Sequence, residues 1–177
     1  MAVIPYQSKD LAEPRELVAA IRARRGGTLL NLDRMLLHSP PFAEGWNGFL
    51  RAVRSELTVS PKLRELAICV VALLNHADYE YRHHAPEFLK SGGSAVQLDA
   101  LGRAGSSDID LTAFAAEERA VLALAVEMTR TVEVSAATMA STRAALANDR
   151  HVVEIVGVIA TYNMVARFLV ALGVEPE

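Results

Sequence analysis

Thiols are almost absent from this chain, because Cys69 is the only cysteine among its 177 residues. A single cysteine excludes an intrachain disulfide and a dithiol redox couple. Strong charge is absent too, since the formal net charge is only -3. A balance this close to neutral gives no electrostatic reason to expect nucleic acid or an anionic membrane as a partner.

Segments typical of sheets and membranes are also missing. No stretch shows sustained alternation of apolar and polar residues bounded by turn pairs, so we predict no β-strands. The longest apolar runs are interrupted by charge or are too short to span a bilayer. Residues 1–16 lack the basic and then apolar layout of a signal peptide. We therefore expect a cytoplasmic protein that binds neither membrane nor nucleic acid.

Apolar residues at helical spacing are abundant, and 51% of the chain is hydrophobic. Residues 1–177 suffice for one domain with a sizeable core. We predict an all-α bundle of about eight or nine helices, in which the helices of 10–57 and 115–172 pack around a core motif at 60–104. The predicted helices cover residues 10–25, 28–38, 42–57, 61–74, 79–90, 95–101, 117–129, 136–146 and 151–172.

Helix start and stop signals separate these elements. Ser94 with Gln97 has the form of a capping box. Asn75 or Asp78 is able to cap the helix that follows. The prolines at 40–41 are expected to break the chain between two helices.

Glu65 is the one charged residue in a stretch that is otherwise apolar all round the helix, so it should be buried. A buried carboxylate must be paired, hydrogen-bonded or functional, because an unpaired buried charge is costly. A simple salt bridge with Arg64 is the structural alternative. Cys69 lies four residues after Glu65 on the same face, either as a small buried side chain or as part of a site.

Glu80 and His84 are four residues apart, which places them on one face of the next helix. A turn of only a few residues joins the two helices, so they pack roughly antiparallel and Glu65 can approach His84. His83 points about 100° away from His84, so both cannot face one small pocket. Tyr79 lies one turn before His83 and is a candidate pocket residue. The alternative is an exposed ion pair without function.

Two carboxylates and an imidazole in a core suggest acid–base chemistry. We expect burial to raise the pKa of a carboxyl and to lower the pKa of the imidazole, which brings both toward neutrality. Glu80 and His83 have the Glu-x-x-His spacing of di-iron bundles, but the sequence has no second copy of that motif. A single metal on Glu65, Glu80 and His84 is conceivable, yet we predict neither a metal nor a cofactor.

The segment RELAICVVALLNHADYEYRHHAPEFLKSGG, residues 64–93, resembles the signature of the carboxymuconolactone decarboxylase family, which includes the alkyl hydroperoxidase D-like proteins. The shared pattern is Arg-Glu, an apolar helix, a short turn, Tyr-Glu-aromatic-x-x-His and a helix ended by glycine. Residues 30–41 and 162–167 resemble flanking segments of the longer members. The resemblance implies a helical homo-oligomer with its site near a subunit interface.

In the hydroperoxidase members the catalytic pattern is a glutamate, a Cys-x-x-Cys pair and a histidine four residues later. When the chain is aligned on Glu65 and His84, the two cysteine positions hold Ala77 and Glu80. The resemblance therefore implies that Glu65 and His84 are proton-relay positions, while the dithiol peroxidase mechanism does not carry over. The decarboxylase members remove carboxylate from a lactone acid without a metal or an organic cofactor.

We therefore predict a cofactor-independent decarboxylase or lyase-type enzyme that acts on a small organic acid or lactone. His84 is the expected general acid/base, Glu80 orients it or shuttles protons, and Glu65 completes the relay. The candidate substrate-binding residues are Tyr79, His83, Cys69 and Arg167. One alternative is a peroxidase-like antioxidant protein, as the family label of peroxiredoxin activity suggests. The other is a non-enzymatic oligomeric protein that binds a small molecule.

Overall fold

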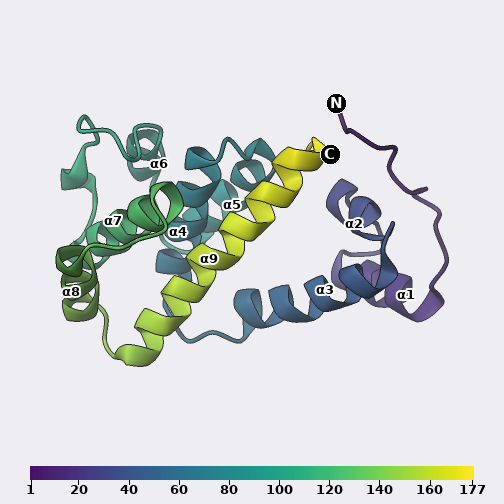
Figure 1. Ribbon diagram of the computed structural model, residues 1–177, viewed down its shortest axis with the longest axis horizontal. Coiled ribbons are helices and arrows are strands. Elements are labelled where there is room, and N and C mark those ends of the chain that lie inside the picture. The colour runs from purple at the N-terminus through teal and green to yellow at the C-terminus, as the bar shows by residue number, and fades with distance from the viewer. The chain divides into compact units, whose positions relative to one another are not determined.

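The computed structural model describes all of residues 1–177 and contains nine α-helices, a short 3-10 helix and no strand, which confirms the all-α prediction (Figure 1). The chain divides into two compact units, one formed by Met1–Leu57 with Leu169–Glu177 and the other by Thr58–Phe168. The single domain predicted over residues 1–177 stays a prediction. The helices are α1 (Arg15–Arg24), α2 (Asn31–Leu36), α3 (Pro40–Ser55), α4 (Pro61–Leu74), α5 (Asp78–Lys90), α6 (Ala95–Leu101), η1 (Leu111–Ala113), α7 (Ala116–Arg130), α8 (Ala136–Ala145) and α9 (Asp149–Leu172).

The α4–α5 hairpin forms the centre of the unit Thr58–Phe168. Every side chain from Glu65 to Ala72 of α4 is buried, as its apolar pattern predicts. α4 packs against both α5 and α7, and α7 also packs against α8 (Figure 1). His76 adopts a left-handed conformation, with φ at 54°, in the short turn between α4 and α5. The hairpin thus packs α4, which carries Glu65, against α5, which carries Glu80.

The helix starts agree with the sequence signals in part. Ser94 Oγ accepts the N–H of Gln97 at 3.2 Å, and the Gln97 side chain accepts the N–H of Ser94 at 3.0 Å, so the capping box is confirmed. The N-cap of α5 is Ala77, so the caps predicted for this helix are wrong, and Asp78 is its first residue. The prolines at 40–41 begin α3 instead of only separating helices, because proline lacks the N–H that the first turn leaves unpaired.

α9 is the longest helix and corrects one prediction. Its 24 residues are long and apolar enough to cross a membrane by length and composition, whereas the sequence predicted no such run. Half of the most apolar 18-residue stretch of α9 is buried in the structure, and Ile155, Val158 and Ile159 are fully buried. A core helix of a soluble protein has the same properties, so α9 is weak evidence for a membrane. The cytoplasmic location stays a prediction.

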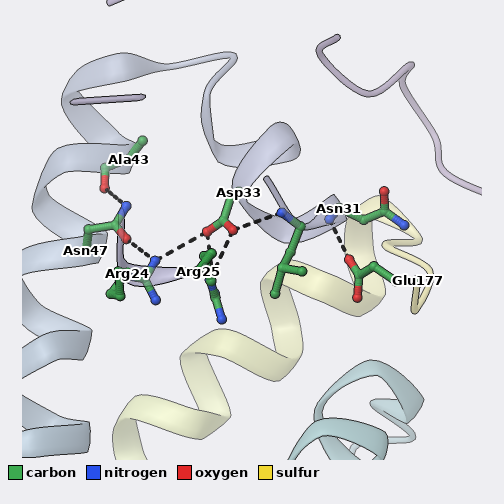
Figure 2. A network of polar contacts seen from close by, with 8 residues as sticks. Arg24, Arg25, Asn31, Asp33, Ala43, Asn47 and Glu177 are labelled. Atoms are coloured by element: carbon green, nitrogen blue, oxygen red, sulfur yellow. Dashed lines mark hydrogen bonds and ion pairs between the residues drawn. The ribbon is translucent and has the colours of Figure 1, made fainter. Parts of the chain in front are cut away.

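Asp33 organises the polar interior of the other unit. Its carboxylate is 1% exposed and accepts hydrogen bonds from Arg24 at 3.4 Å, from Arg25 at 3.1 Å and from the backbone N–H of Leu30 at 3.1 Å. Figure 2 shows this carboxylate bonded to both arginines, with Asn47 bonded to Arg24. A buried charge needs such partners, and charge-assisted hydrogen bonds are among the stronger ones.

Candidate functional site

A buried hydrogen bond between a glutamate and a histidine joins the two helices of the hairpin. His84 Nδ1 on α5 lies 2.6 Å from Glu65 Oε2 on α4. Glu65 is only 5% exposed and His84 only 8%. The predicted convergence of these two side chains is therefore confirmed, while their role in catalysis stays a prediction.

Glu80 contacts the other side of the same imidazole. Its Oε2 lies 3.2 Å from His84 Nε2, one helical turn away on α5, and its side chain is 2% exposed. Glu65, His84 and Glu80 thus form a row that we call the triad. Each ring nitrogen of His84 lies within ion-pair distance of a carboxylate oxygen, so an imidazolium at this position has a negative neighbour on both sides.

The triad reverses the pKa directions expected from burial. Burial alone would lower the pKa of His84, but its hydrogen bonds with Glu65 and Glu80, together with their negative charges, raise it. Burial alone would raise the pKa of Glu65, but the hydrogen bond from His84 and the charges of His84 and Arg64 lower it. Our expected directions are wrong because neighbouring charges outweigh desolvation. At a pH above the pKa of Glu65 and below the pKa of His84, Glu65 is therefore a carboxylate and His84 is an imidazolium.

Two further side chains touch the triad. Arg64 Nε donates to Glu65 Oε1 at 3.3 Å, so the salt bridge considered as an alternative to a site exists alongside it. The buried ring of Tyr162 on α9 stands edge to face against the His84 imidazole, with ring centres 5.0 Å apart. The sequence assigned neither residue to the site. Two features of the sequence could have identified them. Arg64 directly precedes Glu65, and Tyr162 begins the segment 162–167 that resembles a flanking segment of the longer family members.

Tyr79 and His83 form a pair of their own on α5. Their rings are stacked with centres 4.3 Å apart, and His83 Nδ1–H donates to the Tyr79 carbonyl oxygen at 2.8 Å. Tyr79 is buried and His83 is half-buried. This geometry agrees with the prediction that His83 and His84 point in different directions. A substrate-binding role for either ring stays a prediction.

Cys69 and Arg167 have environments that differ from those expected of substrate ligands. The Cys69 thiol is fully buried, and burial together with the Glu65 charge raises its pKa to about 12. Such a thiol stays protonated and is a poor nucleophile. Arg167 is exposed, and its Nη1 donates to the backbone and side-chain oxygens of Asn163, one turn earlier on α9. Arg167 is therefore held by its own helix.

The acidic and imidazole side chains of the triad are bonded to one another. No group of three or more His, Cys, Asp or Glu side chains has the arrangement of a metal site. Both imidazole nitrogens of His84 face carboxylate oxygens. Neither nitrogen therefore points at a place where a metal ion could also be bound by Glu65 and Glu80.

Several solved structures share this fold. A peroxidase-related protein from Silicibacter sp. TM1040 is 20% identical, with a TM-score of 0.79, over 99% of this chain and 90% of its own. A peroxidase-related protein from Ralstonia eutropha JMP134, described as an alkylhydroperoxidase AhpD core, is 16% identical with a TM-score of 0.80. The match covers 99% of this chain and 92% of that protein. The debrominase Bmp8, solved in complex with 2,3,4-tribromopyrrole, is 15% identical with a TM-score of 0.79. The match covers 100% of this chain and 94% of that protein. These similarities confirm the fold.

The family to which the chain belongs is shown by its sequence. A comparison with curated proteins finds no match. The family model of the carboxymuconolactone decarboxylases matches residues 40–127, a stretch that includes all three members of the triad. The chain lacks the Cys-x-x-Cys pair, since Cys69 is its only cysteine. The protein therefore belongs to the carboxymuconolactone decarboxylase family.

Proposed function

We propose that this protein is a cofactor-independent lyase-type enzyme that removes CO2 from a small organic acid or lactone by general acid–base catalysis. The observation that carries the proposal is the buried row in which His84 lies 2.6 Å from Glu65 and 3.2 Å from Glu80. A positioned acid that delivers a proton in the transition state typically contributes about 10²–10⁴ to a rate.

In this proposal Glu80 meets the substrate. Each nitrogen of His84 already faces a carboxylate, and one oxygen of Glu65 lies against Arg64. Glu80 also stands where the resemblance to the hydroperoxidases places their second cysteine. This refines the expectation that His84 itself is the acid that touches the substrate.

The proposed step moves one electron pair and one proton. The bond between the substrate carboxylate and its neighbouring carbon breaks, CO2 leaves, and a carbonyl of the substrate takes up the electron pair as an enolate. The His84 imidazolium gives its Nε2 proton to the Glu80 carboxylate, Glu80 passes that proton to the enolate carbon, and His84 regains a proton from solvent. Glu65 stabilises that imidazolium, in line with the raised pKa of His84.

Thiol-dependent peroxide reduction is the weaker candidate. Its dithiol would occupy the positions of Ala77 and Glu80, and neither carries sulfur. The only thiol, Cys69, is buried and has its pKa raised to about 12. A binding protein without chemistry is the remaining alternative, and only turnover separates it from the lyase.

The proposal is tested by assaying CO2 release from a panel of β-keto acids and lactone acids. We expect His84→Ala to lower kcat on any accepted substrate by about 100-fold or more. His151→Ala is the matched control, because His151 lies at the start of α9, outside the triad. Full activity in a folded His84→Ala variant would remove the mechanism. Peroxide consumption that survives Cys69→Ala would show a different chemistry.

A further inference from the structure

One side of α9 is open to solvent along most of the helix, which runs without a break (Figure 1). Positions spaced three or four residues apart on this side are all exposed, and we call them the α9 stripe. They are Asp149, Val153, Gly157, Ala160, Met164 and Arg167. At 100° per residue these positions lie within about 80° of one another around the helix, so they form one face.

The middle of the stripe is apolar or small although it faces solvent. Val153 is 71% exposed and Met164 is 40% exposed. Gly157 lies between them, and nothing is within 4 Å of a Cβ added there. A glycine inside a helix is less favourable than an alanine, and packing within this chain gives no reason for it. A second helix that packs closely on this face would explain both the exposed apolar side chains and the glycine.

Opposite charges lie at the two ends of the stripe. Asp149 and Arg167 are five helical turns apart, about 27 Å, and so lie on the same side of α9. The Arg167 guanidinium donates only to oxygens of Asn163 and has no acidic partner. Asp149 Oδ1 lies 3.4 Å from Arg143, but both side chains are more than half exposed, so this ion pair contributes little. Both end charges are thus open to a partner.

The stripe is complementary to itself when the α9 helices of two copies run antiparallel about a point near residue 158. Opposite charges then meet at both ends, and apolar or small side chains meet between them. The pairs are Asp149 with Arg167, Val153 with Met164, and Gly157 with Ala160. A parallel arrangement would place like charges together at each end, which is unfavourable. Antiparallel contact between identical surfaces is the geometry of an isologous two-fold dimer.

We propose that a second copy of this chain docks on the α9 stripe, with the two α9 helices antiparallel in a two-fold dimer. The family resemblance implies an oligomer but no particular surface, and the order of residues along α9 supplies one. Tyr162, which touches His84, is rotated about 180° around α9 from the centre of the stripe. Dimer formation therefore leaves the triad within each copy, and the inference does not depend on the proposed lyase activity.

Sedimentation equilibrium of the full-length protein across the micromolar range tests the proposal. We expect the wild type to show a monomer–dimer equilibrium. Arg167→Glu should raise the dissociation constant by about tenfold or more, because two ion pairs are lost and each new carboxylate faces the partner's Asp149. Asp149→Arg should have a similar effect, because it places arginines together at both ends of the stripe.

An equimolar mixture of these two variants separates charge pairing from damage to the fold. When an Asp149→Arg copy meets an Arg167→Glu copy in the antiparallel arrangement, opposite charges face each other at both ends. The mixture should therefore dimerise about tenfold more tightly than either variant alone. Failure of the mixture to recover would contradict the proposed pairs.

Ala160→Glu tests the middle of the stripe independently of the end charges. Ala160 is exposed and glutamate is a good helix former, so we expect the variant to fold. Two carboxylates close to the two-fold axis should raise the dissociation constant by about tenfold or more. Ala140→Glu is the matched control, because Ala140 is an exposed alanine on α8, and it should dimerise like the wild type.

Other occupants of the stripe predict different results, and each would overturn the proposal. A wild type that stays monomeric through the micromolar range would exclude the dimer. An assembly that Arg167→Glu and Ala160→Glu leave unchanged would use another surface. Co-sedimentation of monomeric wild type with phosphatidylcholine vesicles, lost in Ala160→Glu, would assign the stripe to a lipid surface.

Discussion

His84 has a carboxylate on each side of its ring, and this arrangement was predictable from spacing. The i, i+4 relation put Glu80 and His84 on one face, and the short turn brought Glu65 across from them. The pKa directions were not predictable in this way, because they depend on how far partner charges outweigh burial. The sequence contains the residues of an ion pair but not its distances. For the same reason it does not reveal that the ring of Tyr162 touches the imidazole.

The ion pair between Glu65 and His84 should make stability depend on pH. The folded-state pKa of His84 is raised above 6.5, so its contribution is complete below pH 6.5 and is lost as pH rises through the raised value. The folded-state pKa of Glu65 is lowered below 4.5, so its contribution is complete above pH 4.5 and is lost as pH falls through the lowered value. The stabilisation is therefore largest between pH 4.5 and 6.5.

Urea unfolding at a series of pH values checks this prediction. The difference in unfolding free energy between the wild type and Glu65→Gln should be largest in that window and should shrink on both sides. Glu87→Gln is the control, since Glu87 is half exposed on α5 and pairs with Lys90. Parallel pH profiles for the wild type and Glu65→Gln would show that the pair contributes nothing to stability.

Cys69 should be unreactive in the folded protein. Its thiol is buried and its pKa is raised to about 12, so almost no thiolate is present at pH 8. We expect no labelling by Ellman's reagent in buffer on the time scale on which a free thiol reacts fully in urea. Fast labelling of the native protein would contradict this and would return thiol chemistry to consideration.

The helices were more predictable than their ends. The capping box at Ser94 was evident because its residue types and spacing are specific. The start of α3 at Pro40 was not, because proline both ends one helix and begins another, and only the path of the chain distinguishes the two.

Gly93 closes α5 at a position where a side chain has no room. A Cβ at Gly93 would overlap the ring of Phe88, which is fully buried. We predict that Gly93→Ala lowers the unfolding free energy by about 1–3 kcal/mol, because overpacking displaces neighbours. Gly157→Ala is the matched control: Gly157 lies within α9, has nothing within 4 Å of an added Cβ, and should gain up to about 1 kcal/mol from helix propensity. Thermal unfolding that ranks both variants equally would contradict the steric argument.

At the scale of the whole molecule, the division into two units was not apparent from the sequence. The unit that contains Trp46 joins residues 1–57 to residues 169–177, and such long-range pairing leaves no local pattern. The homo-oligomer stays a prediction, and light scattering that finds a stable monomer at micromolar concentration would count against it.

The C-terminal residues should stabilise the unit to which they return. Val174 is 7% exposed, the N–H of Glu175 donates to the Tyr6 hydroxyl at 2.9 Å, and Glu177 accepts the backbone N–H of Asn31 at 2.6 Å (Figure 2). Deleting residues 174–177 exposes the surface that Val174 covers and removes these bonds. We expect the free energy of unfolding of this unit to fall by about 2 kcal/mol, mostly from lost apolar burial.

Trp46 makes this measurement local, because the only tryptophan lies in the affected unit. The urea midpoint followed by Trp46 fluorescence should fall in the truncated protein. Val170→Ala is the control, since Val170 is 51% exposed near the same end of the chain and its truncation should change stability by less than about 0.5 kcal/mol. If the truncated protein kept the wild-type midpoint, the contacts of the C-terminal residues would be incidental. The unit would then depend on α1, α2 and α3 alone, and its apparent closure by residues 169–177 would have no energetic meaning.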